Sequence, residues 1–192
     1  MTEGTEARVF ALRRAGPDDV PALHALIAVS AGGLGTQDYS PEQISAALKG
    51  VFGVDSQLIA DGTYFVAECG GRIVGCGGWS RRSSLFGSDT LAGRDQRPLD
   101  PRTQPARVRA FFVHPDYARR GIAHTLLERC EAEAAGAGFS AMELVATLTG
   151  VRFYAAEGYA SGAPFDEPLG SGASMRLVPM RKALGSSPSG LT

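Results

Sequence analysis

The sequence contains few of the residues that build disulfide-rich or metal-binding proteins. Its 192 residues include three cysteines, at positions 69, 76 and 130, with no Cys-x-x-Cys pair and no spacing typical of metal ligands. We therefore expect buried, reduced thiols in a cytoplasmic protein, with neither a disulfide framework nor a metal site.

Net charge and long apolar runs are also lacking. The 19 Lys and Arg residues nearly balance the 20 Asp and Glu residues, and a net charge of −1 argues against a nucleic-acid or membrane-surface partner. No apolar run approaches the about 20 residues that span a bilayer. The N-terminal segment MTEGTEARVF has no apolar region like that of a signal peptide.

The length and the remaining composition are ordinary for a globular protein, with 44% hydrophobic and 20% charged residues. Neither an internal repeat nor a shift in composition divides the chain. We expect a single domain over residues 1–184 and a disordered tail, GSSPSGLT, over residues 185–192.

The most specific pattern lies at residues 107–124, RVRAFFVHPDYARRGIAH. Val108, Ala110 and Phe112 alternate with Arg107, Arg109, Phe111 and Val113, which predicts a strand with two faces at period two. Pro115 ends this strand, and a basic glycine turn then leads into a helix. Because a helix start has unpaired N–H groups and the positive end of its dipole, this arrangement favours a bound phosphate.

These residues resemble the signature of the GNAT-type (Gcn5-related) N-acetyltransferases, which use acyl-CoA. That signature is a strand ending in apolar-x-Val, followed by Arg/Gln-x-x-Gly-x-Gly/Ala at the start of a helix. Phe111-Phe112-Val113 match the strand end, and Gly121 and Ala123 match the turn. Ala118 replaces the usual Arg or Gln, so one side-chain contact to the cofactor is missing.

The other elements follow the order of the GNAT fold. Strands are predicted over residues 8–14, 63–68, 73–79, 107–113, 141–146, 159–165 and 174–180. Helices are predicted from near Asp18 to residues 31–33, from the capping box at Ser40 through Val51, over residues 119–135 and over residues 149–157. The predicted fold class is α/β (α+β), with a mixed sheet of six to seven strands and helices on both faces. The resemblance adds a splayed parallel pair, residues 108–113 and 141–146.

The resemblance implies acetyl-CoA as co-substrate, in the gap between the splayed strands. The backbone of Phe111, Phe112 and Val113 would bind the pantetheine arm. Backbone N–H groups of Arg119, Arg120, Gly121, Ile122, Ala123 and His124 would hold the pyrophosphate. Thr147 stands where many relatives carry an Asn that bonds the cofactor, and its hydroxyl offers one donor in place of two.

The segment FYAAEGY at residues 153–159 is a second match to the family. In relatives, a Tyr at the position of Tyr154 lies near the thioester sulfur. A phenol with a pKa of about 10 can protonate the departing thiolate, so Tyr154 is the candidate catalytic residue. The alternative is a core aromatic. An N–H near Phe112 or Val113 would polarise the thioester carbonyl.

The general base and the acceptor contacts are less specified. Where some relatives carry a Glu on the cofactor strand, this chain has Arg109, which would either bind an acceptor carboxylate or form a structural salt bridge. A water chain, Glu68, Asp38 or another acid would then carry the proton. Trp79 would either line the acceptor pocket or fill the core, beside a glycine cluster that suggests a bulge or a close backbone approach.

Residues 81–105 form a long loop without periodicity, either a substrate lid that clamps an acidic group or a solvated insertion. Together, these features predict an N-acetyltransferase that moves an acetyl group to a small-molecule or peptide amine by direct attack in a ternary complex. The alternative is a non-catalytic acyl-CoA-binding sensor. Because dimers are common in the family, a homodimer is a candidate state.

Overall fold

The computed structural model describes residues 10–170 and 172–185. The expected disordered tail therefore lies outside the described residues, except for Gly185. Eight strands form one sheet in the order β1-β2-β3-β4-β5-β8-β6, and β7 also pairs with β8. The strands are β1 (Ala11–Arg14), β2 (Tyr64–Cys69), β3 (Arg72–Ser80), β4 (Ala106–Val113), β5 (Ala141–Thr147), β6 (Ala160–Ser161), β7 (Phe165–Leu169) and β8 (Ala173–Ala183).

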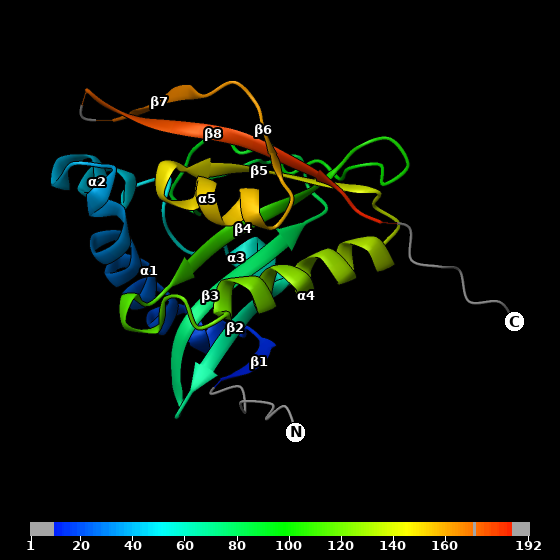
Figure 1. The fold of residues 1–192 in the computed structure, drawn as a ribbon, viewed down its shortest axis with the longest axis horizontal. Coiled ribbons are helices and arrows are strands. Elements are labelled where there is room, and N and C mark those ends of the chain that lie inside the picture. Colours follow the sequence, from blue (N-terminus) through cyan, green and yellow to red (C-terminus); the bar gives the residue numbers. More distant parts are fainter. Residues whose placement is uncertain (1–9, 171, 186–192) are drawn as a thin grey trace, which may run out of the picture.

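Helices cover both faces of this sheet, as predicted (Figure 1). They are α1 (Val20–Leu34), α2 (Pro41–Ala47), α3 (Ser56–Ala60), α4 (Ile122–Gly136) and α5 (Leu148–Ala156), with short 3₁₀ turns at Pro17–Asp19, Gly35–Gln37 and Pro115–Tyr117. The apolar sides of α4 and α5 share one core cluster with the sheet, whereas α1, α3 and α2 pack on the opposite face in two further clusters.

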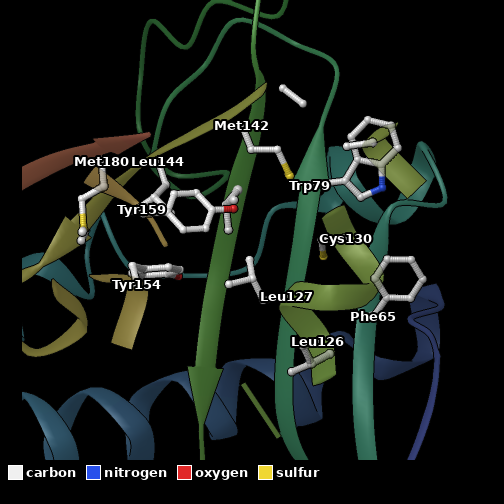
Figure 2. Packing of buried hydrophobic residues seen from close by; sticks show 14 of the residues in the cluster. Phe65, Trp79, Leu126, Leu127, Cys130, Met142, Leu144, Tyr154, Tyr159 and Met180 are labelled. Carbon is white, nitrogen blue, oxygen red and sulfur yellow. The ribbon is translucent and has the colours of Figure 1, made fainter. Parts of the chain in front are cut away.

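The largest core cluster lies between the sheet and the helices α4 and α5 (Figure 2). Leu126, Leu127 and Cys130 on one side of α4 belong to the same cluster as Met142 and Leu144 of β5. The spacing places the apolar side chains of α4 on one face. Burying them stabilises the fold by about 0.8 kcal/mol per CH₂ group, which fixes α4 against the sheet. The start of α4 is thereby held beside the end of β4.

Local signals placed several elements correctly. Ser40 caps α2 by accepting from the Gln43 N–H at 3.2 Å, and the Gln43 side chain accepts from the Ser40 N–H at 2.9 Å. Gly70 and Gly71, both with positive φ, make the predicted hairpin turn between β2 and β3.

Other boundaries differ from prediction. The helix α2 ends at Ala47, so Val51 lies beyond it, and the short α3, capped by Asp55, was not predicted. The helix α1 continues through its glycines to Leu34. A Cβ atom at Gly33 would lie 2.3 Å from Pro115 Cγ. The glycine there permits close packing and does not end the helix.

The strand predicted over residues 159–165 is in fact two strands, β6 and β7, which raises the count to eight. Both pair with the same edge of β8, and the regular ladder is interrupted between them, although the Gly162 N–H still donates to the Pro179 carbonyl at 2.7 Å. Neither Pro164 nor Pro179 has an N–H to donate, which weakens the ladder at this point. Among the described helices, none is long and apolar enough to cross a membrane.

Candidate active site

The parallel strands β4 and β5 separate soon after they begin. They pair only at Ala106 with Met142 and at Arg107 with Glu143, where the two charged side chains form an ion pair. Beyond this point no ladder joins the strands, so the N–H and C=O groups along both edges need other partners. The predicted splayed pair is confirmed, and its open edges suit an extended amide-containing ligand.

A β-bulge interrupts β4 at Ala110. Cys76 faces Phe112 and Gly78 faces Arg109, so three steps along β4 match two along β3, and Ala110 has a positive φ of 54°. The extra residue moves the side chains that follow it to the opposite face of the sheet. Val108, Phe111 and Val113 pack in the cluster under α4, while Phe112 packs on the other face. The strict alternation expected from the sequence is therefore wrong beyond Arg109.

The backbone N–H groups after the bulge have distinct partners. Phe112 pairs with Cys76 across the β3–β4 ladder. Burial raises the pKa of the Cys76 thiol to about 12, and contacts with the Tyr64 hydroxyl and the Phe112 backbone offset part of this rise. The Val113 N–H donates to the Ser30 hydroxyl of α1 at 3.2 Å. If regular alternation resumes after the bulge, the Phe111 N–H is directed away from β3, toward the gap, and we use this orientation as an inference.

The start of α4 forms a concave group of backbone donors. Arg119 and Gly121 have positive φ values of 61° and 78°, so the predicted helix over residues 119–135 begins only at Ile122. Gly121 is the N-cap residue, and no side chain caps the helix there. Nothing lies within 4 Å of where a Gly121 Cβ would be. The N–H groups of the first turn are thus available to an anion.

The remaining turn residues contribute in different ways. Arg119 and Arg120 are exposed, and the Arg120 guanidinium lies 5.0 Å from the Tyr117 ring centroid. The Ile122 side chain is buried, which anchors the helix start in the core, and Ala123 is half-buried. The imidazole of His124 contacts Glu157 at 3.0 Å and Glu128 at 3.4 Å. His124 would therefore serve an anion through its backbone N–H.

Tyr154 on α5 lies beside the gap, on the α4 face of the sheet (Figure 2). Its ring centroid is 6.3 Å from that of Phe111 and 5.7 Å from that of Tyr159. Burial, with a smaller contribution from Cys130, raises the pKa of Tyr154 above its ordinary value. Within the described residues its hydroxyl has no hydrogen-bond partner, so it is a protonated phenol without a competing contact.

Thr147 ends β5 and is the N-cap residue of α5. Its hydroxyl oxygen accepts from the Gly150 N–H at 3.2 Å. The hydroxyl proton remains available, so Thr147 retains the single donor expected from the sequence.

Trp79 is a core residue in this structure. It is 3% exposed, its ring centroid lies 6.1 Å from that of Phe139, and its indole N–H donates to Glu133 of α4 at 3.4 Å. Of the two sequence-based alternatives, the structure shows core packing, so Trp79 is not brought to the site.

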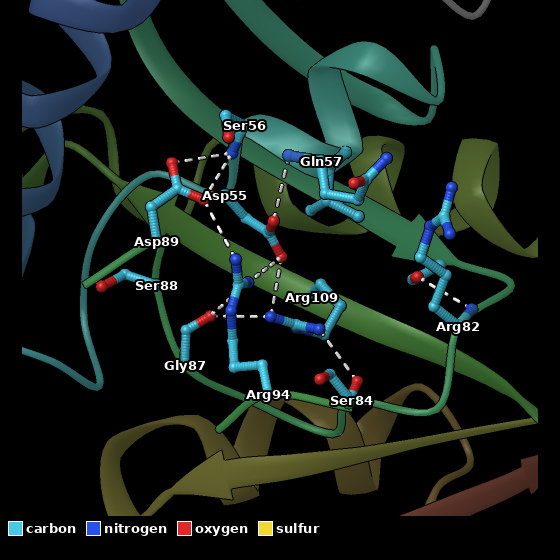
Figure 3. A network of polar contacts seen from close by, with 12 residues as sticks. Asp55, Ser56, Gln57, Arg82, Ser84, Gly87, Ser88, Asp89, Arg94 and Arg109 are labelled. Atoms are coloured by element: carbon cyan, nitrogen blue, oxygen red, sulfur yellow. Dashed lines mark hydrogen bonds and ion pairs between the residues drawn. The ribbon is translucent and has the colours of Figure 1, made fainter. Parts of the chain in front are cut away.

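Arg109 takes part in a buried network (Figure 3). Its guanidinium donates to Asp55 at 2.7 Å and to the carbonyls of Ser84 and Gly87 at 2.8 and 2.7 Å. Arg94 also pairs with Asp55, at 3.0 Å. The acceptor role predicted for Arg109 would need donors that these partners occupy, so the structural salt bridge is the alternative that the geometry favours.

The loop at residues 81–105 is tied to its surroundings. The Ser88 hydroxyl donates to the Gly50 carbonyl at 2.7 Å, and the Ser56 N–H donates to Asp89 at 3.0 Å. At its other side, Phe86 reaches β7, with ring centroids 6.4 Å from Phe165. Four of its five arginines pair with acids, so a clamp for an acidic substrate gains no support.

The two acids named as candidate bases lie in different places. Asp38 accepts from the Thr149 hydroxyl at 2.7 Å and so lies at the start of α5. Glu68 pairs with Arg13 of β1 at 2.9 Å, at the edge of the sheet far from β5 in strand order. Asp38 is therefore the better placed of the two.

Sequence analysis missed two residues that shape this region, Asp55 and Ser30, which contact strands far away in the chain. Tyr39, which the sequence favoured as an ordinary turn residue, is instead buried and makes contacts far away in the chain. The Tyr39 hydroxyl accepts from the Leu148 N–H at 2.7 Å and donates to the Arg176 carbonyl at 2.6 Å. A helix-capping pattern at Asp55 was the only local signal.

A cavity of about 340 Å³ lies elsewhere, between α1 and the β2–β3 turn. Its lining includes Arg13, Glu68, Arg72 and His114 but none of the residues predicted to bind a cofactor or acceptor. The gap between β4 and β5 remains the candidate site. In the part of the chain that the structure describes, no cluster of side chains could hold a metal ion.

Comparisons with known proteins agree with this geometry. The family profile described as acetyltransferase (GNAT) domain matches residues 60–161. A sequence comparison with curated proteins found no significant match.

Solved structures show the same fold. A GCN5-related N-acetyltransferase from Rhodopseudomonas palustris is 23% identical, with a TM-score of 0.69 over 95% of this chain and 100% of that one. PaiA N-acetyltransferase from Thermoplasma acidophilum, in complex with coenzyme A, is 15% identical, with a TM-score of 0.62 over 91% and 98%. YncA from Salmonella typhimurium, with its cofactor acetyl-CoA, is 15% identical, with a TM-score of 0.58 over 94% and 97%.

Proposed function

The chain belongs to the GNAT acetyltransferase family, and on that premise we propose that it transfers an acetyl group from acetyl-CoA to the amine of a small molecule or peptide. The observation that carries this proposal is the open gap between β4 and β5, which leads to the uncapped start of α4. The extended pantetheine arm of acetyl-CoA matches the gap, and its pyrophosphate matches the start of α4.

The residues present fit acetyl-CoA. The carbonyl groups on the free edge of β4 would bond the pantetheine amides, which leaves the Phe111 N–H for the thioester. Phe112 and Val113 would shape the strand and its side-chain contacts. The backbone N–H groups of residues 119–124 would hold the pyrophosphate, each charge-assisted bond contributing about 1.5–3 kcal/mol. Acetyl-CoA supplies the activated acyl group, and the protein supplies position and proton transfer.

The Phe111 N–H is our candidate for polarising the thioester carbonyl. Of the two groups first considered for this role, the Phe112 backbone already contacts Cys76 and the Val113 N–H already donates to Ser30. A donor aimed at the developing negative charge, with no competing partner, stabilises the transition state most effectively.

Tyr154 is our candidate general acid. Its buried phenol stays protonated at neutral pH and lies against Phe111, so it could give its proton to the departing thiolate. The acceptor amine would lose a proton to water or to Asp38, since β4 carries no acidic residue. The nitrogen would attack directly, with no acyl-enzyme.

Release of CoA from acetyl-CoA, measured over a broad panel of amines, tests the proposal. We expect turnover with at least one amine and calorimetric binding of acetyl-CoA. Binding without transfer to any amine would favour the acyl-CoA sensor, to which the absence of an acid on β4 also points.

A further inference from the structure

Two buried side chains contact the carbonyl of Ala110, the bulge residue, on the face of the sheet opposite α4. The Tyr64 hydroxyl of β2 is placed to donate to the Ala110 carbonyl at 3.3 Å, and the Cys76 thiol of β3 to the same carbonyl at 3.7 Å. The Tyr64 hydroxyl also lies 3.3 Å from Cys76 Sγ. Both residues are 0% exposed, so no water competes for these contacts.

Ala110 needs such support. Its φ of 54° is a left-handed conformation that residues with a Cβ atom disfavour. In this conformation its carbonyl leaves the regular ladder and would remain unpaired in a buried environment without Tyr64 and Cys76. Burial raises the pKa of Tyr64 well above its ordinary value, so the phenol keeps the proton that it donates.

The neighbouring glycine lets Tyr64 reach the bulge. Tyr64 pairs with Gly78 across β2 and β3, and a Cβ at Gly78 would lie 2.9 Å from Tyr64 Cδ2. Gly78 of β3 therefore makes room for the Tyr64 ring, and the Tyr64 hydroxyl in turn contacts the left-handed residue Ala110 of β4.

We propose that Tyr64, assisted by Cys76, is a positioning residue that holds the Ala110 bulge and thereby aims the Phe111 N–H into the gap. The inference rests on the proposed function, because the aimed N–H matters only if it polarises an acyl carbonyl. Tyr64 itself lies beneath the strand and does not touch the reacting atoms.

The test is Tyr64→Phe, which removes the hydroxyl and keeps the ring. We expect kcat for amine acetylation to fall about 10-fold, less than the loss from removing an oxyanion donor outright. The calorimetric Kd for acetyl-CoA should stay within about twofold, because the pyrophosphate site at α4 is untouched. The control is Ser88→Ala, which also removes a buried hydroxyl, since Ser88 is 3% exposed and donates to the Gly50 carbonyl at 2.7 Å. It should lose stability but keep kcat.

A second variant separates positioning from general damage. Glycine adopts a positive φ without steric cost, so Ala110→Gly in the Tyr64→Phe protein should recover most of the lost kcat. The same change in the Ser88→Ala protein should not raise kcat. A kcat for Tyr64→Phe within about twofold of the unchanged protein overturns the inference, as does a loss of kcat that follows a matching loss of acetyl-CoA affinity.

The inference can fail separately from the proposed function. If the unchanged protein acetylates no amine, the proposed function fails. The Phe111 amide resonance then decides the inference: it should shift on Tyr64→Phe and move back with Ala110→Gly. An unaltered Phe111 resonance overturns it, as does poor folding of Tyr64→Phe that Ala110→Gly leaves unimproved.

Discussion

The ring of Phe111 occupies the space in front of Gly77, where a Cβ atom would lie 2.6 Å from Phe111 Cε2. Phe111 can point this way only because the bulge at Ala110 turns it onto the α4 face. Its ring then lies between the glycine of β3 and the phenol of Tyr154. Of the two alternatives predicted from the glycine cluster, the bulge is confirmed by the register shift between Cys76 and Gly78. The Phe111 ring then lies beside the proposed thioester site.

Replacement of Tyr154 by Phe tests the general acid. We expect turnover to fall about 10–1000-fold, in or just below the range of general acid–base catalysis. Acetyl-CoA should still bind, as measured by calorimetry. Because the hydroxyl has no partner among the described residues, the urea midpoint should not fall. Unchanged turnover would remove Tyr154 from this role.

Replacement of Gly121 by Ala tests the anion site. At a φ of 78° the added Cβ costs about 1–2 kcal/mol, and the displaced backbone should weaken acetyl-CoA binding about 10-fold. Gly62→Ala is the matched control, since Gly62 has a φ of 68° and equally open space. Calorimetry should show a weaker affinity for the Gly121 variant only; an equal loss in both would contradict a binding role for the turn.

Replacement of Asp55 by Asn tests the buried network. Arg109 and Arg94 would then lose their shared carboxylate at side-chain exposures of 3% and 12%. The uncompensated charges should lower the free energy of unfolding by about 3–5 kcal/mol, measured by urea denaturation. Asp166→Asn, whose partner Arg176 is half exposed, should cost about 0–1 kcal/mol. If the two variants lost similar amounts of unfolding free energy, the buried network would add little to stability.

Thiol labelling tests the predicted core cysteines. Burial raises the pKa of Cys76 to about 12 and that of Cys130 well above its ordinary value, so at neutral pH both stay protonated and hidden. Cys69 is only partly buried. A thiol reagent at about pH 8 should therefore modify Cys69 alone in the folded protein, and all three after unfolding, as mass spectrometry would show. Rapid labelling of folded Cys69→Ser protein would contradict this.

Features encoded by neighbouring residues were predictable. The capping box at Ser40, the glycine turn between β2 and β3, and the basic glycine turn before α4 each depend on a few consecutive residues. The GNAT resemblance of residues 107–159 also rests on such motifs, and it indicated the splayed strands before their pairing was known. Local hydrogen-bonding needs and hydrophobic periodicity determine these elements.

Tertiary structure alone decided how the site is assembled. Nothing beside Ala110 in the sequence marks a left-handed residue, because the bulge depends on Tyr64 and Cys76 from other strands. The partner of Arg109 lies 54 residues away, so its role could not be read from β4 alone. The sequence determined the strand, the turn and the helix of the cofactor site. Packing between distant segments determined which side chains face the gap, since one extra residue in a strand reverses every face that follows.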